Sequence, residues 1–300
     1  MELSGLMKLR IAAAVATGVV LIGILAWPLA TPSGPLSIVR AGDLSFGGGL
    51  ILVILAFLAG FIAYFLSWPY GREIGILAVP SGLAIWAVHS GSMAALLQLN
   101  PTAAQRQALL ATFKWDSIFW LVIVAAGFAG VLLGQKILSS PRPAEKRKKS
   151  NSKPVKYLNA IIALVGSALI AHFCIRIFAQ DVKELDGLGS VVAMAQPSVG
   201  QILFAVLISF KIAAFVVKKF LDVSYIWPAI ATVLVTAFST ITYANQEVLQ
   251  DFVQRWPATF FPNTVVSILP LQMVAFGTLG SIAGYWMGVR YSYWRKHEIK

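Results

Sequence analysis

Cysteine and charge are both scarce in this sequence. Cys174 is the only cysteine among 300 residues, so no intrachain disulfide can form and cysteine usage indicates no redox compartment. Charged residues make up 12% of the chain, against about a quarter in soluble proteins, whereas 58% is hydrophobic. A soluble domain of this size cannot bury so much apolar surface, so the bilayer must act as its solvent.

Motifs that bind nucleotides, metals or cofactors are missing as well. The sequence has no P-loop, no HExxH pair, no GxSxG in a strand–turn–helix context and no DDxxD-like acidic cluster. No segment between apolar runs is long enough for a soluble catalytic domain. These absences weigh against an enzyme without excluding one, and nothing in the sequence calls for a cofactor.

Long apolar runs are what the sequence has instead. A hydrocarbon core about 30 Å thick is crossed by roughly 20 helical residues, and in lipid the backbone must pair its polar groups within the helix. Eight runs meet this requirement: 11–30, 48–67, 74–95, 117–137, 157–178, 199–217, 224–244 and 266–288. We therefore predict an all-α polytopic membrane protein with eight transmembrane helices.

The first apolar run has an alternative interpretation as a signal peptide, because Lys8 and Arg10 precede it. The run is longer than a usual signal core, and no clear small-x-small cleavage site follows it. Both features favour a retained transmembrane helix.

The basic residues predict how the chain is oriented. A net charge of +12 raises nucleic-acid binding as an alternative, but Lys and Arg lie in short stretches between apolar runs, as membrane topology requires. With the N-terminus inside, 17 of the 24 basic residues fall on the cytoplasmic side and 5 on the other. We expect an integral protein of the bacterial inner membrane, with both termini cytoplasmic and no nucleic-acid partner.

Two series of glycines suggest an internal duplication. The fourth and eighth runs contain glycines with the same steps of three and four: Gly127, Gly130, Gly134 and Gly277, Gly280, Gly284. Further pairs at an offset of about 150 include Gly18 with Gly166 and Pro80 with Pro228. Four spans per copy give both copies the same orientation, so we predict two parallel four-helix repeats, 1–138 and 156–300.

The linker between the predicted repeats, 139–155, is rich in proline, serine and basic residues. Basic residues over 142–156 predict contact with anionic lipid headgroups, each worth about 1 kcal/mol near a membrane surface. The simpler interpretation is a solvated hinge that helps to set the topology, and we favour it.

Glycines at positions i, i+3 and i+7 share one helix face, and the second series extends to Gly288. Such a face lets another helix backbone approach closely. Packing within the bundle is the simpler prediction. The alternatives are that the two faces meet, or that one meets a partner subunit, in which case the eighth helix is the better candidate for contact with a membrane protein.

Four ionisable residues within or at the edge of spans are candidates for ligand binding. His89 and His172 lie at similar depth in spans three and five, where two histidines could ligate a haem or a metal, a less favoured interpretation than hydrogen bonding to neighbouring helices. Arg176 ends span five and Lys211 lies mid-span in span six. For both, the simpler interpretation is that the long side chain snorkels to the interface. The alternative for Arg176 is binding of an anionic ligand, and the alternative for Lys211 is a position facing a cavity between the repeats.

Two loop segments, 98–116 and 245–263, predict short amphipathic helices on the outer membrane interface. Pro80 and Pro228 lie near the starts of spans three and seven. There proline is tolerated, although in transporters a broken helix also frames a binding site.

Three function classes remain open. A permease that moves a small solute between two parallel repeats is the leading hypothesis, on architecture alone. A non-catalytic subunit or scaffold of a larger membrane complex fits the scarcity of buried polar groups and the glycine faces. A haem-binding redox protein is a remote third, because it depends on His89 and His172.

Overall fold

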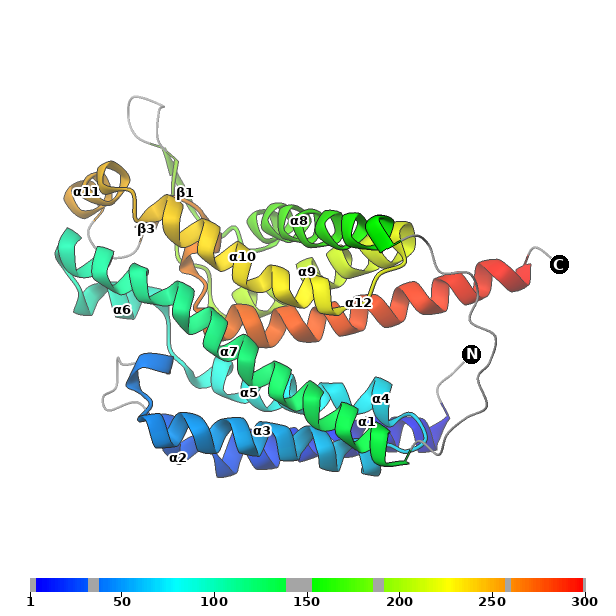
Figure 1. Cartoon of the computed structure of the whole chain (residues 1–300). Helices are drawn as coiled ribbons and strands as arrows, with labels where there is room; N and C mark the ends of the chain where they lie inside the picture. The colour runs from blue at the N-terminus through cyan, green and yellow to red at the C-terminus, as the bar shows by residue number, and fades with distance from the viewer. Residues whose placement is uncertain (1–3, 32–37, 139–152, 186–191, 257–259, 299–300) are drawn as a thin grey trace.

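The computed structural model describes residues 4–31, 38–138, 153–185, 192–256 and 260–298. Its long helices run up and down through one bundle, with both marked chain ends at the same end (Figure 1). In chain order they are α1 (Gly5–Gly18), continued by the π-helix η1 (Val19–Leu25), α3 (Phe46–Leu66), α5 (Ala78–His89), α7 (Ala103–Leu138), α8 (Lys153–Phe178), α9 (Val199–Leu221), α10 (Ile226–Tyr243) and α12 (Pro270–Glu298). We call the described residues up to 138 the N-terminal half and those from 153 the C-terminal half.

Seven helical segments are long and apolar enough to cross a membrane. They are Gly5–Leu25, Phe46–Leu66, Gly71–His89, Ala103–Leu138, Lys156–Phe178, Val199–Leu221 and Ile226–Tyr243. The third begins with two short helices, α4 (Gly71–Ile74) and η3 (Gly75–Leu77), that lead directly into α5. The structure thus confirms seven of the eight predicted apolar spans.

The eighth predicted span, 266–288, is helical from Pro270 but is not among those seven. Helix α12 runs through the middle of the bundle (Figure 1), and no residue between Pro270 and Gly284 is exposed. Its buried residues include Gln272, Thr278 and Ser281. A helix that is enclosed by protein does not need the apolar surface of one that faces lipid, which explains its lower hydropathy.

Exposed apolar side chains surround the bundle. Helix α8 shows this most clearly, because large apolar residues cover its outward face: Leu158, Ile161, Ile162, Val165, Leu169, Phe173 and Ile177. In water such a surface would be an aggregation hazard. In a bilayer it is the lipid-facing surface, and seven apolar helices of this length indicate an integral membrane protein.

Helix α7 corrects the prediction for 98–116. That segment is not a separate interfacial helix, because α7 is continuous from Ala103 to Leu138 and only the short α6 (Met93–Leu99) precedes it. No glycine or proline interrupts the chain between residues 103 and 126, so nothing ends the helix at the membrane boundary. The counterpart segment, 245–263, contains Pro257 and Pro262, and Pro270 follows it. There α11 (Gln246–Arg255), β3 (Phe260–Phe261) and η4 (Thr264–Ser267) precede α12.

A cap covers the end of the bundle opposite the C-terminus of α12 (Figure 1). It consists of α6, the first turns of α7, α11 and a three-stranded antiparallel sheet in the order β1 (Lys183–Leu185), β2 (Val192–Ala195), β3. The register pairs Lys183 with Met194 and Met194 with Phe261. The strands are two to four residues long, too short to show the alternation that identifies a strand in sequence.

The two glycine faces pack inside the chain. Helix α7 lies on α3, and a Cβ added to Gly130 would lie 2.0 Å from the carbonyl oxygen of Phe57. Helix α12 lies on α9 in the same way, with 2.3 Å between a Cβ at Gly280 and the carbonyl oxygen of Leu207. Between the halves the packing is crossed, since α7 also contacts α10 and α12 also contacts α5.

Candidate functional site

Lys211 lies midway along α9 on the side packed against α12. A Cβ added to Gly284 would lie 2.1 Å from its carbonyl oxygen. Its side chain is half-buried, and the described residues include no carboxylate that pairs with it. Because the glycines of α12 bring the two backbones so close, Lys211 lies beside a helix contact within the C-terminal half.

The two intramembrane histidines are not brought together. His89 is exposed at the end of α5, where its Nδ1 lies 2.8 Å from the carbonyl oxygen of Ile85 and its ring meets Trp27. His172 lies in α8, with its ring centroid 5.7 Å from that of Phe238. Helix α5 packs on α1 and α12, whereas α8 packs on α9 and α10. This arrangement gives a shared haem no support.

Arg176 is exposed in the last turn of α8, at the end of the bundle where the cap lies. Within the described ranges, no group of three or more His, Cys, Asp and Glu side chains is arranged to hold a metal ion. Pro80 and Pro228 each occupy the third residue of their α-helix, α5 and α10, where proline is tolerated. The geometry therefore gives the prolines an ordinary role at a helix start.

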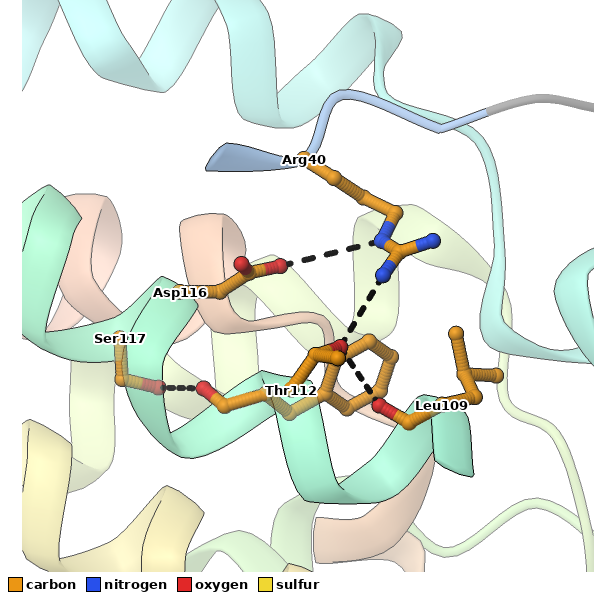
Figure 2. Close-up of polar contacts among 6 residues, drawn as sticks. Arg40, Leu109, Thr112, Asp116 and Ser117 are labelled. Carbon is orange, nitrogen blue, oxygen red and sulfur yellow. Dashed lines mark hydrogen bonds and ion pairs between the residues drawn. The ribbon is translucent and has the colours of Figure 1, made fainter. Parts of the chain in front are cut away.

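An ion pair that sequence reasoning did not single out lies where α7 leaves the cap (Figure 2). Arg40, in the segment before α3, has its Nε 3.9 Å from a carboxylate oxygen of Asp116, and its Nη2 donates a 3.0 Å hydrogen bond to Thr112. The Asp116 side chain is 6% exposed, and the Nε atom of Arg40 is buried without a hydrogen-bond partner among the described residues. The pair ties the segment before α3 to α7.

A second buried cation, Arg106, lies inside the cap. It is 1% exposed, and its Nε donates a 2.9 Å hydrogen bond to the carbonyl oxygen of Asn100. Its guanidinium also lies near the hydroxyl of Tyr243 on α10. A buried arginine must be paired to be tolerated, so Arg106 fixes the turn between α6 and α7 beside the C-terminal half.

Buried hydroxyls are concentrated in the C-terminal half. Four residues on α10, Thr232, Thr236, Ser239 and Thr240, are buried, and each hydroxyl donates to a carbonyl of the preceding turn. Further buried polar atoms in this half have no hydrogen-bond partner within the described chain: Ser167 Oγ, His172 Nδ1, Ser209 Oγ, Thr264 Oγ1 and Thr278 Oγ1. Within the described residues, hydroxyls therefore make up most of the polar interior of this half.

Gln272 connects the two halves at the start of α12. Its amide nitrogen lies 3.4 Å from the carbonyl oxygens of both Ala87 and Gly91, at the end of α5, and its amide oxygen accepts from the backbone N–H of Leu269. The side chain is 1% exposed. One buried amide thus holds the end of an N-terminal helix against a C-terminal one.

The remaining predictions concern faces that are filled or residues outside the described ranges. The glycine face of α12 is occupied by α9, so a partner reached through the eighth helix would have to use another surface, and that partner stays a prediction. Most of the linker 139–155 lies outside the described residues, and its lipid contact stays a prediction too.

The tertiary contacts of Arg40 and Asp116 join residues that are 76 positions apart. The one sequence signal was an acidic residue, Asp116, directly before an uncharged apolar run.

No protein-family model, curated protein or solved structure matches this chain.

Proposed function

We propose that this chain is a non-catalytic structural subunit of a membrane complex, with a bundle that stays closed. The observation that carries the proposal is the core of the cap, which is shared by both halves. Leu97 and Phe113 from the N-terminal half pack in one cluster with three aromatic residues of the C-terminal half, Tyr243, Phe252 and Phe261, and all five are almost fully buried.

The size of this shared core argues against a moving permease. Alternating access requires the two halves to separate at each face of the membrane in turn. Separation at the cap would expose these five large side chains, at about 2 kcal/mol each and about 10 kcal/mol in all. A population shift between two functional states spans only a few kcal/mol. The cap therefore supports a fixed arrangement.

The space between the halves is also filled by side chains. Leu271, Val274 and Ala275 of α12 belong to the same buried cluster as Trp86 of α5 and Trp120 of α7. Each of the five is at most 1% exposed. A solute path between the halves would have to displace this cluster.

We also propose that the bundle has eight transmembrane helices in two parallel repeats. Helix α12 would be the eighth, and the other helices would surround it within the membrane. Two observations support the duplication. The contact of Gly130 with Phe57 and Phe61 recurs, 150 residues later, as the contact of Gly280 with Leu207 and Lys211. The crossed packing of α7 on α10 and of α12 on α5 is what a twofold axis along the membrane normal would produce.

Not every predicted match supports the duplication. Gly18 packs against the backbone of Ala78, whereas a Cβ at Gly166 would meet nothing within 4 Å.

We propose that both termini are cytoplasmic, as the basic residues indicate, in the inner membrane of a bacterium. Fusion of a reporter that is active on only one side of the membrane to the C-terminus tests that orientation.

Cysteine accessibility tests whether the bundle stays closed. In a Cys174→Ser background, Ala275→Cys places a thiol between the halves, and Lys183→Cys places one on the exposed strand β1. A charged thiol reagent reacts with the thiolate, which forms only where water reaches. We expect Ala275→Cys to react at least about 100-fold more slowly than Lys183→Cys, from both sides of the membrane.

The permease remains the competing function, and the same experiment measures it. Reaction of Ala275→Cys at a rate near that of Lys183→Cys, from either side, would show a water path between the halves and contradict the structural role. The subunit role also requires a partner, so purification in mild detergent should recover a second membrane protein in fixed stoichiometry. A single monodisperse species after purification from native membranes would count against it.

A further inference from the structure

The C-terminal turns of α9 and α12 carry basic and aromatic side chains at the end of the bundle away from the cap. Helix α12 extends past the other helices there (Figure 1). Lys219, Arg290 and Arg295 are all exposed, and we call these three residues the terminal basic cluster. Residues 290 and 294, and residues 291 and 295, are each four positions apart, and such pairs are neighbours on a helix surface.

Aromatic rings hold two of the three cations of this cluster, Lys219 and Arg290, in place. The ammonium of Lys219 lies 4.8 Å from the ring centroid of Tyr291, which joins α9 to α12, and the guanidinium of Arg290 lies 4.6 Å from that of Trp294. Phe215 packs edge-on against Tyr291. Cations fixed over aromatic faces lose less side-chain entropy when an anion binds them than freely moving cations do.

Lys218 has a different role, in which Gly288 takes part. Its ammonium pairs with Asp222 and lies 4.9 Å from the ring centroid of Tyr285. A Cβ added to Gly288 would lie 2.7 Å from Cγ of Lys218. The glycine therefore lets the stem of Lys218 lie flat on α12, which brings the two helix ends together and places Lys219 over Tyr291.

We propose that the terminal basic cluster is a binding site for the headgroup of an anionic phospholipid. The apolar part of α9 ends directly before Lys218, so the cluster lies at the depth of the phosphate groups, and tyrosine and tryptophan favour that depth. At the end of α9, Lys218 pairs with the acidic Asp222, and α12 ends with the acidic Glu298. The site consists of other residues than the linker 142–156, and it stands whether the chain is a subunit or a permease.

Lipid titration followed by native mass spectrometry tests the site on the full-length purified protein. The probes are dioleoyl phosphatidylglycerol, which is anionic, and dioleoyl phosphatidylcholine, which has no net charge. We expect phosphatidylglycerol to bind more tightly. The triple variant Lys219→Gln, Arg290→Gln, Arg295→Gln should weaken its binding at least about tenfold, since each basic residue near the surface contributes roughly fivefold.

Two matched variants make the result specific to this site. Lys114→Gln, Lys183→Gln, Arg255→Gln removes the same charge at the cap end and should leave the affinity within about twofold, because its positions lie beyond a Debye length of about 10 Å from the cluster. Lys219→Arg, Arg290→Lys, Arg295→Lys keeps the charge and should keep most of the affinity. Thermal unfolding of each variant confirms that it is folded.

Three outcomes would overturn the proposal. They are equal affinity for the two lipids, equal losses in the two charge-removing variants, and displacement of phosphatidylglycerol by excess inorganic phosphate. The last would indicate a site for a free anion rather than for a lipid. Gly288→Ala should weaken phosphatidylglycerol binding without a change in net charge, because it displaces the stem of Lys218. Unchanged binding in a folded Gly288→Ala protein would contradict the role given to that glycine.

Discussion

The interiors of the two halves differ in polarity although their helices pack alike. In the N-terminal half, Trp86, Trp120 and Leu83 belong to one buried cluster that η1, α3, α5 and α7 build together with α12 of the other half. In the C-terminal half, the buried face of α10 carries hydroxyls at Thr232, Thr236, Ser239 and Thr240. In both halves the fourth long helix lies on the second through glycines. Two helix backbones can thus approach closely beside an apolar interior as well as beside one that carries hydroxyls.

Local hydrogen bonding explains how the polar interior is tolerated. The hydroxyl of Thr236 donates to the carbonyl oxygen of Thr232 at 3.0 Å, and that of Thr240 donates to Thr236 at 2.8 Å. Each hydroxyl satisfies itself on its own helix, so it requires no partner from another helix. The N-terminal interior depends instead on shape, because Trp86 meets Trp27 and Trp120 edge-on and donates from Nε1 to the carbonyl oxygen of Gly23.

The largest expected effect breaks the feature that the halves share. Gly130→Leu and Gly280→Leu each drive a side chain into a helix backbone, with the first new atom 2.0 Å and 2.3 Å from a carbonyl oxygen. Overpacking costs 1–3 kcal/mol where neighbours can shift, and a backbone carbonyl cannot, so we expect losses of at least about 3 kcal/mol. Size-exclusion chromatography and thermal unfolding in detergent measure the loss.

Gly166→Leu is the matched control for both glycine variants. It makes the same change in α8, where an added Cβ meets nothing within 4 Å, so it should remain near wild-type stability. If Gly130→Leu and Gly280→Leu purify with wild-type size and unfolding temperature, the packing role of the glycines is wrong. If only one of the two variants loses stability, the glycine contact does not contribute equally to the stability of the two halves.

The second prediction concerns the apolar interior. Trp86→Ala removes a fully buried ring and leaves a cavity among η1, α5 and α7, so the free energy of unfolding should fall by about 3–5 kcal/mol. Trp115→Ala is the control, because Trp115 is 65% exposed and should lose less than about 0.5 kcal/mol. Thermal or denaturant unfolding compares the two. Similar losses would mean that the N-terminal interior is not held by this packing.

Helix existence and the close-packed glycines follow from local sequence. Spans depend on apolar length alone, and the step pattern of Gly127, Gly130 and Gly134 places them on one face whatever the fold. The end of α7 that enters the cap was different. Residues 103–116 have the polarity of an interfacial segment and the propensity of a helix, and polarity alone does not tell a separate helix from the continuation of the next one.

The candidate site shows where sequence reasoning ends. Position along a span gave the depths of His89, His172 and Lys211, but direction around the helix axis depends on which neighbours the helix acquires. The structure places the histidines on helices with different neighbours and Lys211 beside α12. The pair of Arg40 with Asp116 and the contacts of Gln272 with α5 join distant segments, so no local pattern predicts them.

The smallest expected effect sharpens the comparison of the interiors. Thr236→Val keeps the β-branched shape and removes a hydroxyl whose described bond is to its own helix, so the free energy of unfolding should change by less than about 1 kcal/mol. Thr242→Val is the control, since the exposed Thr242 makes the same kind of bond, at 2.9 Å, to the carbonyl oxygen of Phe238. Thermal unfolding should not separate the two variants. If Thr236→Val lowers the free energy of unfolding nearly as much as Trp86→Ala does, the Thr236 hydroxyl takes part in a hydrogen-bond network between helices. The buried hydroxyls of the C-terminal half would then be candidates for a functional site.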